Sequence, residues 1–179
     1  MEQLFKCVCL DNREYLTPFN QTMEGRFTHD DSILQALTLL KCGNQWHGSK
    51  IVWAGSQEKV KEGEKTFYEI ATNKYTSLSP TQDKEITDYI SDRYVNTQIF
   101  ASESCEIRYL VNFYLNEYVD LVEFQKEHED LPHALPFLTS TPIKDTPNKY
   151  KDYLGRWRLC RLGAYEELPA NLKLKKLTF

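Results

Sequence analysis

The sequence predicts an α+β fold, mainly antiparallel sheet with two or three helices. Short apolar stretches that end at Asn, Asp, Gly or Pro recur along the chain, which is typical of strands joined by tight turns. One segment instead carries its apolar residues at helical spacing. With 11 Tyr and 9 Phe among 179 residues, the composition favours a β-rich core. A chain of this length is expected to form a single globular domain over residues 1–179.

The first expected element is a β-hairpin. Residues 4–10 (LFKCVCL) form a β-rich apolar stretch, and residues 11–13 (DNR) have turn chemistry. Residues 14–17 (EYLT) resume the strand pattern, and Pro18 ends it.

A helix and a short strand are expected next. Residues 32–40 (SILQALTLL) carry apolar side chains at i, i+1, i+4 and i+7, and either Asp30 or Asp31 can cap the helix. Gly43 stands where a left-handed residue commonly ends a helix. Residues 50–54 (KIVWA) are predicted to form a strand.

The rest of the first half is more polar. Residues 60–65 (VKEGEK) indicate a charged loop, and residues 67–74 a short helix. Ser79-Pro80 begins another segment, since proline suits a first helical turn. Its apolar residues are Ile86, Tyr89, Ile90 and Tyr94.

The chain then repeats its opening pattern. Residues 107–121 can be laid on residues 4–18 without a gap, so that Glu14-Tyr15-Leu16 matches Glu117-Tyr118-Val119. A second match pairs the Gly-bracketed stretch GSKIVWAG (48–55) with GRWRLCRLG (155–163). An apolar segment lies between hairpin and bracketed strand in both cases, over 32–40 and 134–140.

This pattern predicts two related halves, residues 1–100 and 101–179. The alternative, that short β segments look alike by chance, stays open. If the halves are related, the first role of the bracketing glycines is backbone geometry. The last residues, 172–179 (LKLKKLTF), alternate apolar and basic side chains like an edge strand, where lysine discourages aggregation.

Charge, hydropathy and cysteine content argue against some classes of protein. The formal net charge of −4 argues against non-specific nucleic-acid binding, although residues 150–179 carry +4 and the rest −8. No apolar run approaches the roughly 20 residues of a membrane span. The five cysteines, without a recognisable export signal, predict free thiols and a cytoplasmic protein.

No complete catalytic, metal or cofactor motif is present in the sequence. Cys7 and Cys9 share one face of a strand, and Cys42 and His47 could complete a zinc site only if their loop folds over the hairpin. Cys42 and His47 could also form a nucleophile–base pair, but a helix C-terminus disfavours a thiolate. Buried structural cysteines are therefore favoured, with no metal and no cofactor.

Two other polar runs also have plain structural explanations. His29-Asp30-Asp31 is typical of a helix N-terminus, where the helix dipole stabilises acidic residues. Residues 127–130 (EHED), with His133 nearby, indicate a solvated loop.

The best candidates for a binding site are arginines and one glycine-bracketed loop. Arg156 and Arg158 would point to one face of the second bracketed strand, where two guanidinium groups can clamp a phosphate or carboxylate. They could equally pair with the acidic remainder of the chain. Trp46 and His47 precede the first bracketed strand and complete the set of predicted ligand- or partner-binding residues.

The first half also resembles a group of small bacterial proteins of unknown function. The residues that carry the likeness are Asp11–Pro18, Ser32–Leu40, Trp46–Ser49 and Ala54–Ser56. In that group the last two motifs are Trp-x-Gly-Asp and Ala-Gly-Asp, whereas Ser49 and Ser56 replace the acids here. The resemblance covers roughly 80 residues and implies no activity.

The function expected from these observations is a non-catalytic protein-binding module in the cytoplasm. Small size, net acidity and many Tyr and Trp residues favour an immunity-type or anti-defence inhibitor of a toxin or nuclease, with a basic protein partner. The alternative is a sensor or small enzyme that binds an anionic small molecule between the two halves. It would use Arg156, Arg158 and His47. Nucleic-acid binding through the basic C-terminus is the least favoured.

Overall fold

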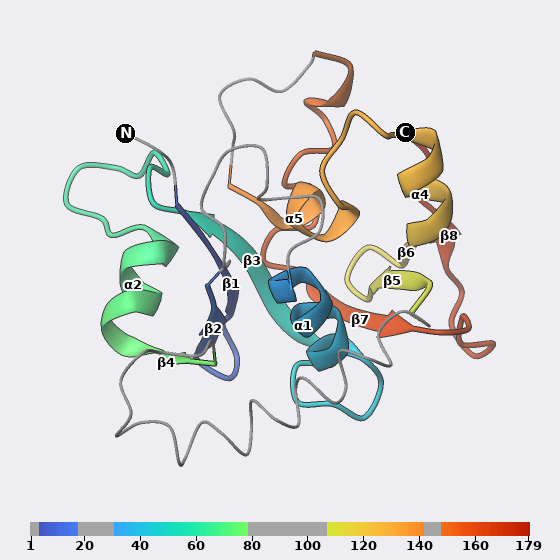
Figure 1. Ribbon diagram of the computed structural model, residues 1–179, viewed down its shortest axis with the longest axis horizontal. Coiled ribbons are helices and arrows are strands. Elements are labelled where there is room, and N and C mark those ends of the chain that lie inside the picture. The colour runs from blue at the N-terminus through green and yellow to red at the C-terminus, as the bar shows by residue number, and fades with distance from the viewer. Residues whose placement is uncertain (1–3, 18–30, 79–106, 142–147) are drawn as a thin grey trace.

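The computed structural model describes residues 4–17, 31–78, 107–141 and 148–179 (Figure 1). These residues form an α+β fold around an eight-stranded, mostly antiparallel sheet, which confirms the predicted fold class. The strand order is β4-β2-β1-β3-β7-β5-β6-β8. The strands are β1 (Phe5–Cys9), β2 (Glu14–Leu16), β3 (Ser49–Gly55), β4 (Thr76–Ser77), β5 (Tyr109–Asn112), β6 (Glu117–Asp120), β7 (Arg161–Tyr165) and β8 (Lys175–Lys176).

The sheet has the same construction when it is followed inward from either edge. Each edge strand, β4 or β8, pairs in parallel with the second strand of a hairpin, β1-β2 or β5-β6. Each hairpin pairs with one of the two central strands, β3 or β7, which join antiparallel at their starts.

The two hairpins also share their register. Val8 pairs with Tyr15, and Val111 pairs with Tyr118, at the constant sequence offset of the predicted match. Arg13 and Asn116, at equivalent turn positions, have positive φ angles of 56° and 54°. The two halves are therefore built alike in the described residues, while a common origin by duplication stays a prediction.

The second bracketed strand lies later in the chain than the sequence match placed it. Residues 151–159 form turns, and β7 begins only at Arg161. The backbone equivalent of Gly48 is Leu159, because both have positive φ (73° and 63°) and each donates its N–H across the β3–β7 junction. The match of glycine to glycine was wrong because the conformation before the strand recurs, and the residue type does not.

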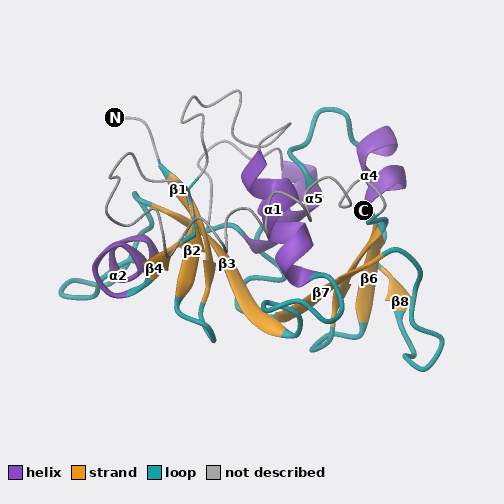
Figure 2. Cartoon of the chain, turned by 60° about the horizontal axis from the view of Figure 1, so that its bottom comes forward, coloured by secondary structure: helices purple, strands orange, loops and turns teal. Residues whose placement is uncertain are grey.

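One face of the sheet carries the main core. Helices α1 (Asp31–Leu40), α4 (Leu121–Glu127) and α5 (Ala134–Thr139) lie on this side (Figure 2). Their apolar residues pack on strand residues such as Cys7, Ile51, Leu110 and Leu162. The three tryptophans, Trp46, Trp53 and Trp157, are fully buried here.

Helix α2 (Phe67–Lys74) packs on the opposite face, over the first half alone. A reciprocal capping box between Thr66 and Glu69 fixes its start. Its buried Ala71 packs with Val8, Val52 and Ala54 in a second, smaller apolar cluster.

Several sequence predictions can be compared with these elements. The predicted helices over 32–40 and 67–74 correspond to α1 and α2, and the C-terminal lysines lie on the edge strand β8. Helix α4 was missed because β6 runs into it without a loop. The predicted segment after Ser79 and the cap at Asp30 lie outside the described residues.

Candidate functional site

Trp46, one of the predicted binding residues, has a structural role. Its side chain is fully buried, and the indole Nε1–H donates to Glu14 Oε2 at 2.8 Å. This hydrogen bond ties the loop before β3 to the hairpin strand β2. Trp46 is therefore not available on the surface.

Arg156 belongs to the equivalent arrangement in the second half. Trp157 Nε1–H donates to Glu117 Oε2 at 2.9 Å, and Arg156 binds the same carboxylate through Nη2 at 2.7 Å and Nε at 3.3 Å. Burial alone raises the pKa of Glu117, but the hydrogen bonds from Arg156 and Trp157 outweigh it, so this pKa lies below its usual value. The guanidinium group of Arg156 is therefore already occupied by a carboxylate.

Arg158 differs from Arg156 in having no ion pair with the part of the chain that the structure describes. Arg158 is exposed in the turn before β7. This turn lies close to β3, because the next residue, Leu159, donates its N–H to Ile51 O at 2.9 Å. The two predicted arginines therefore do not lie on one strand face, and they do not form a clamp.

His47 packs inside an aromatic cluster. Its Nδ1 lies 3.0 Å from Leu40 O, which can only accept, so Nδ1 carries the hydrogen. Its Nε2 lies 3.2 Å from the Tyr165 hydroxyl and accepts from it. Both ring nitrogens are therefore engaged, which leaves His47 no free nitrogen to act as a base toward Cys42.

The two thiols of β1 are poor candidates for chemistry, whereas Cys42 is exposed and Cys160 partly exposed, so the predicted burial of the cysteines is wrong for Cys42. Cys7 and Cys9 are free and fully buried, and burial raises the pKa of both. Within the described ranges, no three His, Cys, Asp or Glu residues are grouped as metal ligands.

A surface that the sequence did not predict lies on the second half of the sheet. We call it the aromatic face and define it by Tyr109, Phe113, Tyr118, Tyr165 and His47. The four Tyr and Phe residues come from β5, β6, β7 and the residue after β5, and strand alternation places them on the face opposite the main core. All five rings are partly exposed.

The rings of the aromatic face contact one another edge to face. Tyr109 and Tyr118 are 5.9 Å apart with an interplanar angle of 76°. His47 contacts Phe113 and Tyr165 at centroid distances of 5.4 Å, with angles of 77° and 84°. These rings cover Val111, which is fully buried although no helix of the described residues lies below β7, β6 and β8 in Figure 2.

Chain length explains why this face differs from its counterpart. The first half connects β3 to β4 through residues 56–75, which include α2. The second half connects β7 to β8 through residues 166–174, which form only turns and bends. Nine residues leave no room for a helix with its two connections, so the connection from β7 to β8 supplies no cover like α2 for the equivalent sheet face.

Gly163 provides the space for the ring of His47. A Cβ at this position would lie 2.7 Å from His47 Cε1 and 2.8 Å from Phe113 Cζ. Gly163 has no positive φ, so its predicted turn role was wrong. Glycine is required here because any side chain on the strand would occupy the space of the His47 ring.

We expect Gly163→Ala to lower the free energy of unfolding by about 1–3 kcal/mol, because the new methyl group overpacks this site. Urea unfolding measures the loss. His47→Ala/Gly163→Ala is the companion variant, since removing the ring relieves part of the clash. Losses that simply add in the double variant would show that Gly163 does not support His47.

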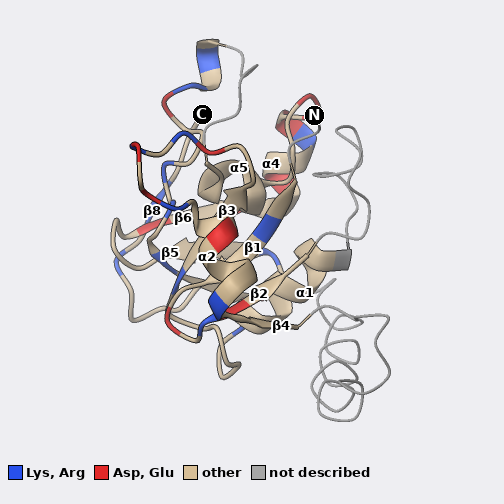
Figure 3. Cartoon of the chain, turned by 90° about the vertical axis from the view of Figure 1, so that its left-hand side faces the viewer, with Lys and Arg blue, Asp and Glu red and all other residues tan. Residues whose placement is uncertain are grey.

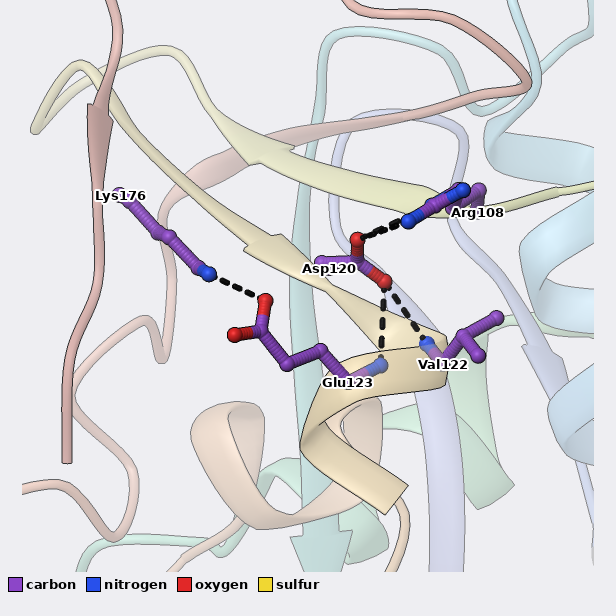
Figure 4. Close-up of polar contacts among 5 residues, drawn as sticks. All are labelled: Arg108, Asp120, Val122, Glu123 and Lys176. Carbon is purple, nitrogen blue, oxygen red and sulfur yellow. Dashed lines mark hydrogen bonds and ion pairs between the residues drawn. The ribbon is translucent and has the colours of Figure 1, made fainter. Parts of the chain in front are cut away.

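A small open pocket, about 220 Å³ of empty space, lies between α4 and β8. Three of its charged lining residues, Asp120, Glu123 and Lys176, are already paired (Figure 4). Asp120 Oδ1 accepts from the N–H groups of Val122 and Glu123 at 3.1 Å, and Oδ2 binds Arg108 at 2.9 Å. Lys176 forms an ion pair with Glu123. These contacts cap α4 and attach β8 to it, so they have a structural explanation.

Comparisons with known proteins give no relative from which a function could be transferred. No family model matches the chain, and no curated protein and no solved structure is significantly similar to it.

Proposed function

We propose that this chain is a non-catalytic protein-binding module and that the aromatic face is its docking surface. One observation carries the proposal: α2 covers this sheet face in the first half, whereas in the second half no helix of the described residues covers the aromatic side chains. Tyrosine is enriched in protein interfaces because a rigid ring gives a large contact area at low entropic cost.

Exposed apolar residues extend the aromatic face at the β5–β6 turn. Tyr114 follows Phe113 in the chain and is 77% exposed, and Leu115 is 36% exposed. Their backbone N–H groups both bond to Asn112 Oδ1 at 2.9 Å, which holds the turn in place. A fixed turn with an outward tyrosine is well suited to contact a partner.

The second function expected from the sequence has less support. It needs Arg156, Arg158 and His47 around one cleft between the halves, and two of these side chains are engaged in other contacts. The pocket between α4 and β8 contains none of them.

The inhibitor form of the proposed function rested partly on net acidity. Residues 79–106 contain six acidic and two basic residues, a net charge equal to that of the whole chain. Of the 22 Lys and Arg, 18 lie in the described residues, as do 16 of the 26 Asp and Glu, a net charge of +2. Acidic and basic positions are interspersed on the side drawn in Figure 3. The described surface therefore gives no support to a basic partner, and inhibition of a toxin or nuclease is proposed without regard to charge.

Affinity capture from lysate of the source cells tests the proposed function. The baits are the wild-type chain, Tyr109→Ala/Tyr118→Ala, the milder Tyr114→Ala, and Tyr75→Ala as the control on the α2 side. We expect a stoichiometric protein partner with the wild type and the control, and at least a tenfold loss with the double variant. Retention by a double variant that melts cooperatively would remove the aromatic face from the proposal.

A further inference from the structure

We infer that the partner presents an acidic amphipathic helix to the aromatic face. This inference rests on the proposed function and names the class of partner.

Helix α2 shows how this sheet architecture receives a helix. It packs on β1 and β3 through a small buried residue, Ala71, with Phe67 and Tyr68 beside it. A polar contact orients it, since Lys6 on β1 binds Thr72 and lies over the ring of Tyr68 at 4.2 Å. A helix that occupies the corresponding surface should share these features: a small or apolar stripe toward the sheet and polar groups at the rim.

In the second half, β5 and β7 form the surface that corresponds to the one on which α2 packs. Val111 occupies the place of Val8, and Gly163 pairs with it across the two strands. The rings of Tyr109, Tyr118 and Tyr165 form the outer layer there. A helix with small residues in its contact stripe can approach such a layer closely, and its apolar side chains would remove these rings from water.

The charge at the β3–β7 junction indicates that the partner helix is acidic. Lys50 and Arg161 pair across the junction of β3 and β7 and point to the same face as Gly163 and Tyr165. Arg161 binds Asp11 at 3.2 Å, whereas Lys50 and Arg158 have no ion pair with the described residues. Lys50 and Arg161 against the one acid Asp11 leave a net charge of +1 on this face. Arg158 adds a cation beside the junction, since the next residue, Leu159, binds Ile51 O. Acidic residues on the rim of the partner helix would complement this charge.

The same combination of rings and cations could suit single-stranded nucleic acid, which stacks its bases on open aromatic faces. Here the ring contacts are edge to face, between 76° and 84°, so one ring of each pair has its face covered by its neighbour. A layer of interlocked rings offers a continuous apolar surface and few stacking platforms, which favours the helix.

Two stapled peptides of about 18 residues, long enough for five helical turns, provide the test. Both have the same Ala/Leu/Phe stripe, and their polar positions are Glu in one and Lys in the other. Binding to the full chain is measured by fluorescence polarisation at low salt. We expect the Glu peptide to bind about tenfold more tightly than the Lys peptide. Equal binding, or tighter binding of the Lys peptide, would overturn the inference.

Two variants locate the binding. Lys50→Glu/Arg158→Glu should reverse the preference between the peptides, and Lys65→Glu, on the loop before α2, should leave it unchanged. Because both charge positions are exposed, these variants should fold like the wild type. Unchanged preference in the double variant overturns the assigned position.

A labelled poly-uridine 12-mer is the competing probe. If it binds with steep salt dependence while neither peptide binds, the surface is a nucleic-acid site and both proposals are wrong. If neither peptide nor RNA binds but affinity capture yields a partner through the aromatic face, the proposed function holds and the helical partner is wrong.

Discussion

Replacing Glu117 with alanine is expected to lower the free energy of unfolding by about 2–4 kcal/mol, because a largely buried carboxylate accepts several charge-assisted or buried hydrogen bonds. Its side chain is 12% exposed and accepts from Trp157 Nε1 and from Arg156. Without Glu117, the fully buried indole N–H of Trp157 loses its acceptor. Urea unfolding at neutral pH measures the loss.

Matched variants separate the parts of this interaction. Arg156 is 39% exposed, so Arg156→Ala should cost about 1 kcal/mol or less, as exposed ion pairs do. Trp157→Phe removes the N–H donor, and in that background Glu117→Ala should cost less than in the wild type. A loss from Glu117→Ala no larger than that from Arg156→Ala would mean that the bond to the tryptophan does not stabilise the fold.

The same carboxylate gives a pH dependence. Its pKa is lowered in the folded protein, so the unfolded chain binds this proton more tightly than the folded chain does. The stabilisation is therefore complete above the ordinary pKa of about 4.5 and is lost as the pH falls through the lower folded value. The difference in unfolding free energy between wild type and Glu117→Gln should shrink on acidification. An unchanged difference would contradict this account.

The elements that the sequence predicted correctly are those with a strong local signal. The apolar spacing over 32–40 corresponds to α1, and the matching hairpin sequences correspond to β1-β2 and β5-β6 with equal register. Helix α4 lacked the loop that usually separates a strand from a helix, yet Asp120 followed three residues later by Glu123 is a typical helix start. That spacing was the available signal.

The candidate site was less predictable because it depends on contacts between distant residues. Trp46 and Arg156 looked like surface anchors, but each belongs to a tryptophan–glutamate arrangement that joins its half of the fold. The aromatic face is formed by residues that alternate along separate strands, and only the pairing of these strands brings the residues together. The short stretch after Gly163 indicated that the second half lacks room for a segment as long as the one after Gly55. It did not indicate that aromatic side chains from three strands meet on the corresponding side of the sheet, where no helix of the described residues lies.

Two glycines show that a sequence pattern does not reveal the contacts around a residue. Gly43 and Gly155 were both predicted to serve backbone geometry, and both have positive φ, 87° and 68°. Their surroundings differ, however: a Cβ on Gly43 would meet no atom within 4 Å, while one on Gly155 would lie 2.5 Å from Ser140 O. A sequence pattern can indicate the conformation at such a position, but it cannot indicate the space around it.

Gly155→Ala is therefore expected to lower the free energy of unfolding by about 3 kcal/mol or more, the sum of left-handed strain and a backbone clash. The oxygen it would meet cannot rotate away, since Ser140 is bridged to Trp53 and the next residue, Thr141, donates its N–H to Trp53 O at 3.1 Å. The clash would therefore be transmitted to β3, in the other half of the fold.

Gly43→Ala is the control, because it adds the same methyl group at the same type of φ in open space. We expect it to cost about 1 kcal/mol, so that the difference between the two variants measures the close approach of the turn to Ser140. Thermal and urea unfolding of both variants give this difference. Equal losses would mean that the turn before β7 and the segment after α5 are far enough apart to accommodate a methyl group at position 155. The two halves would then be held together mainly by the β3–β7 junction and the shared core.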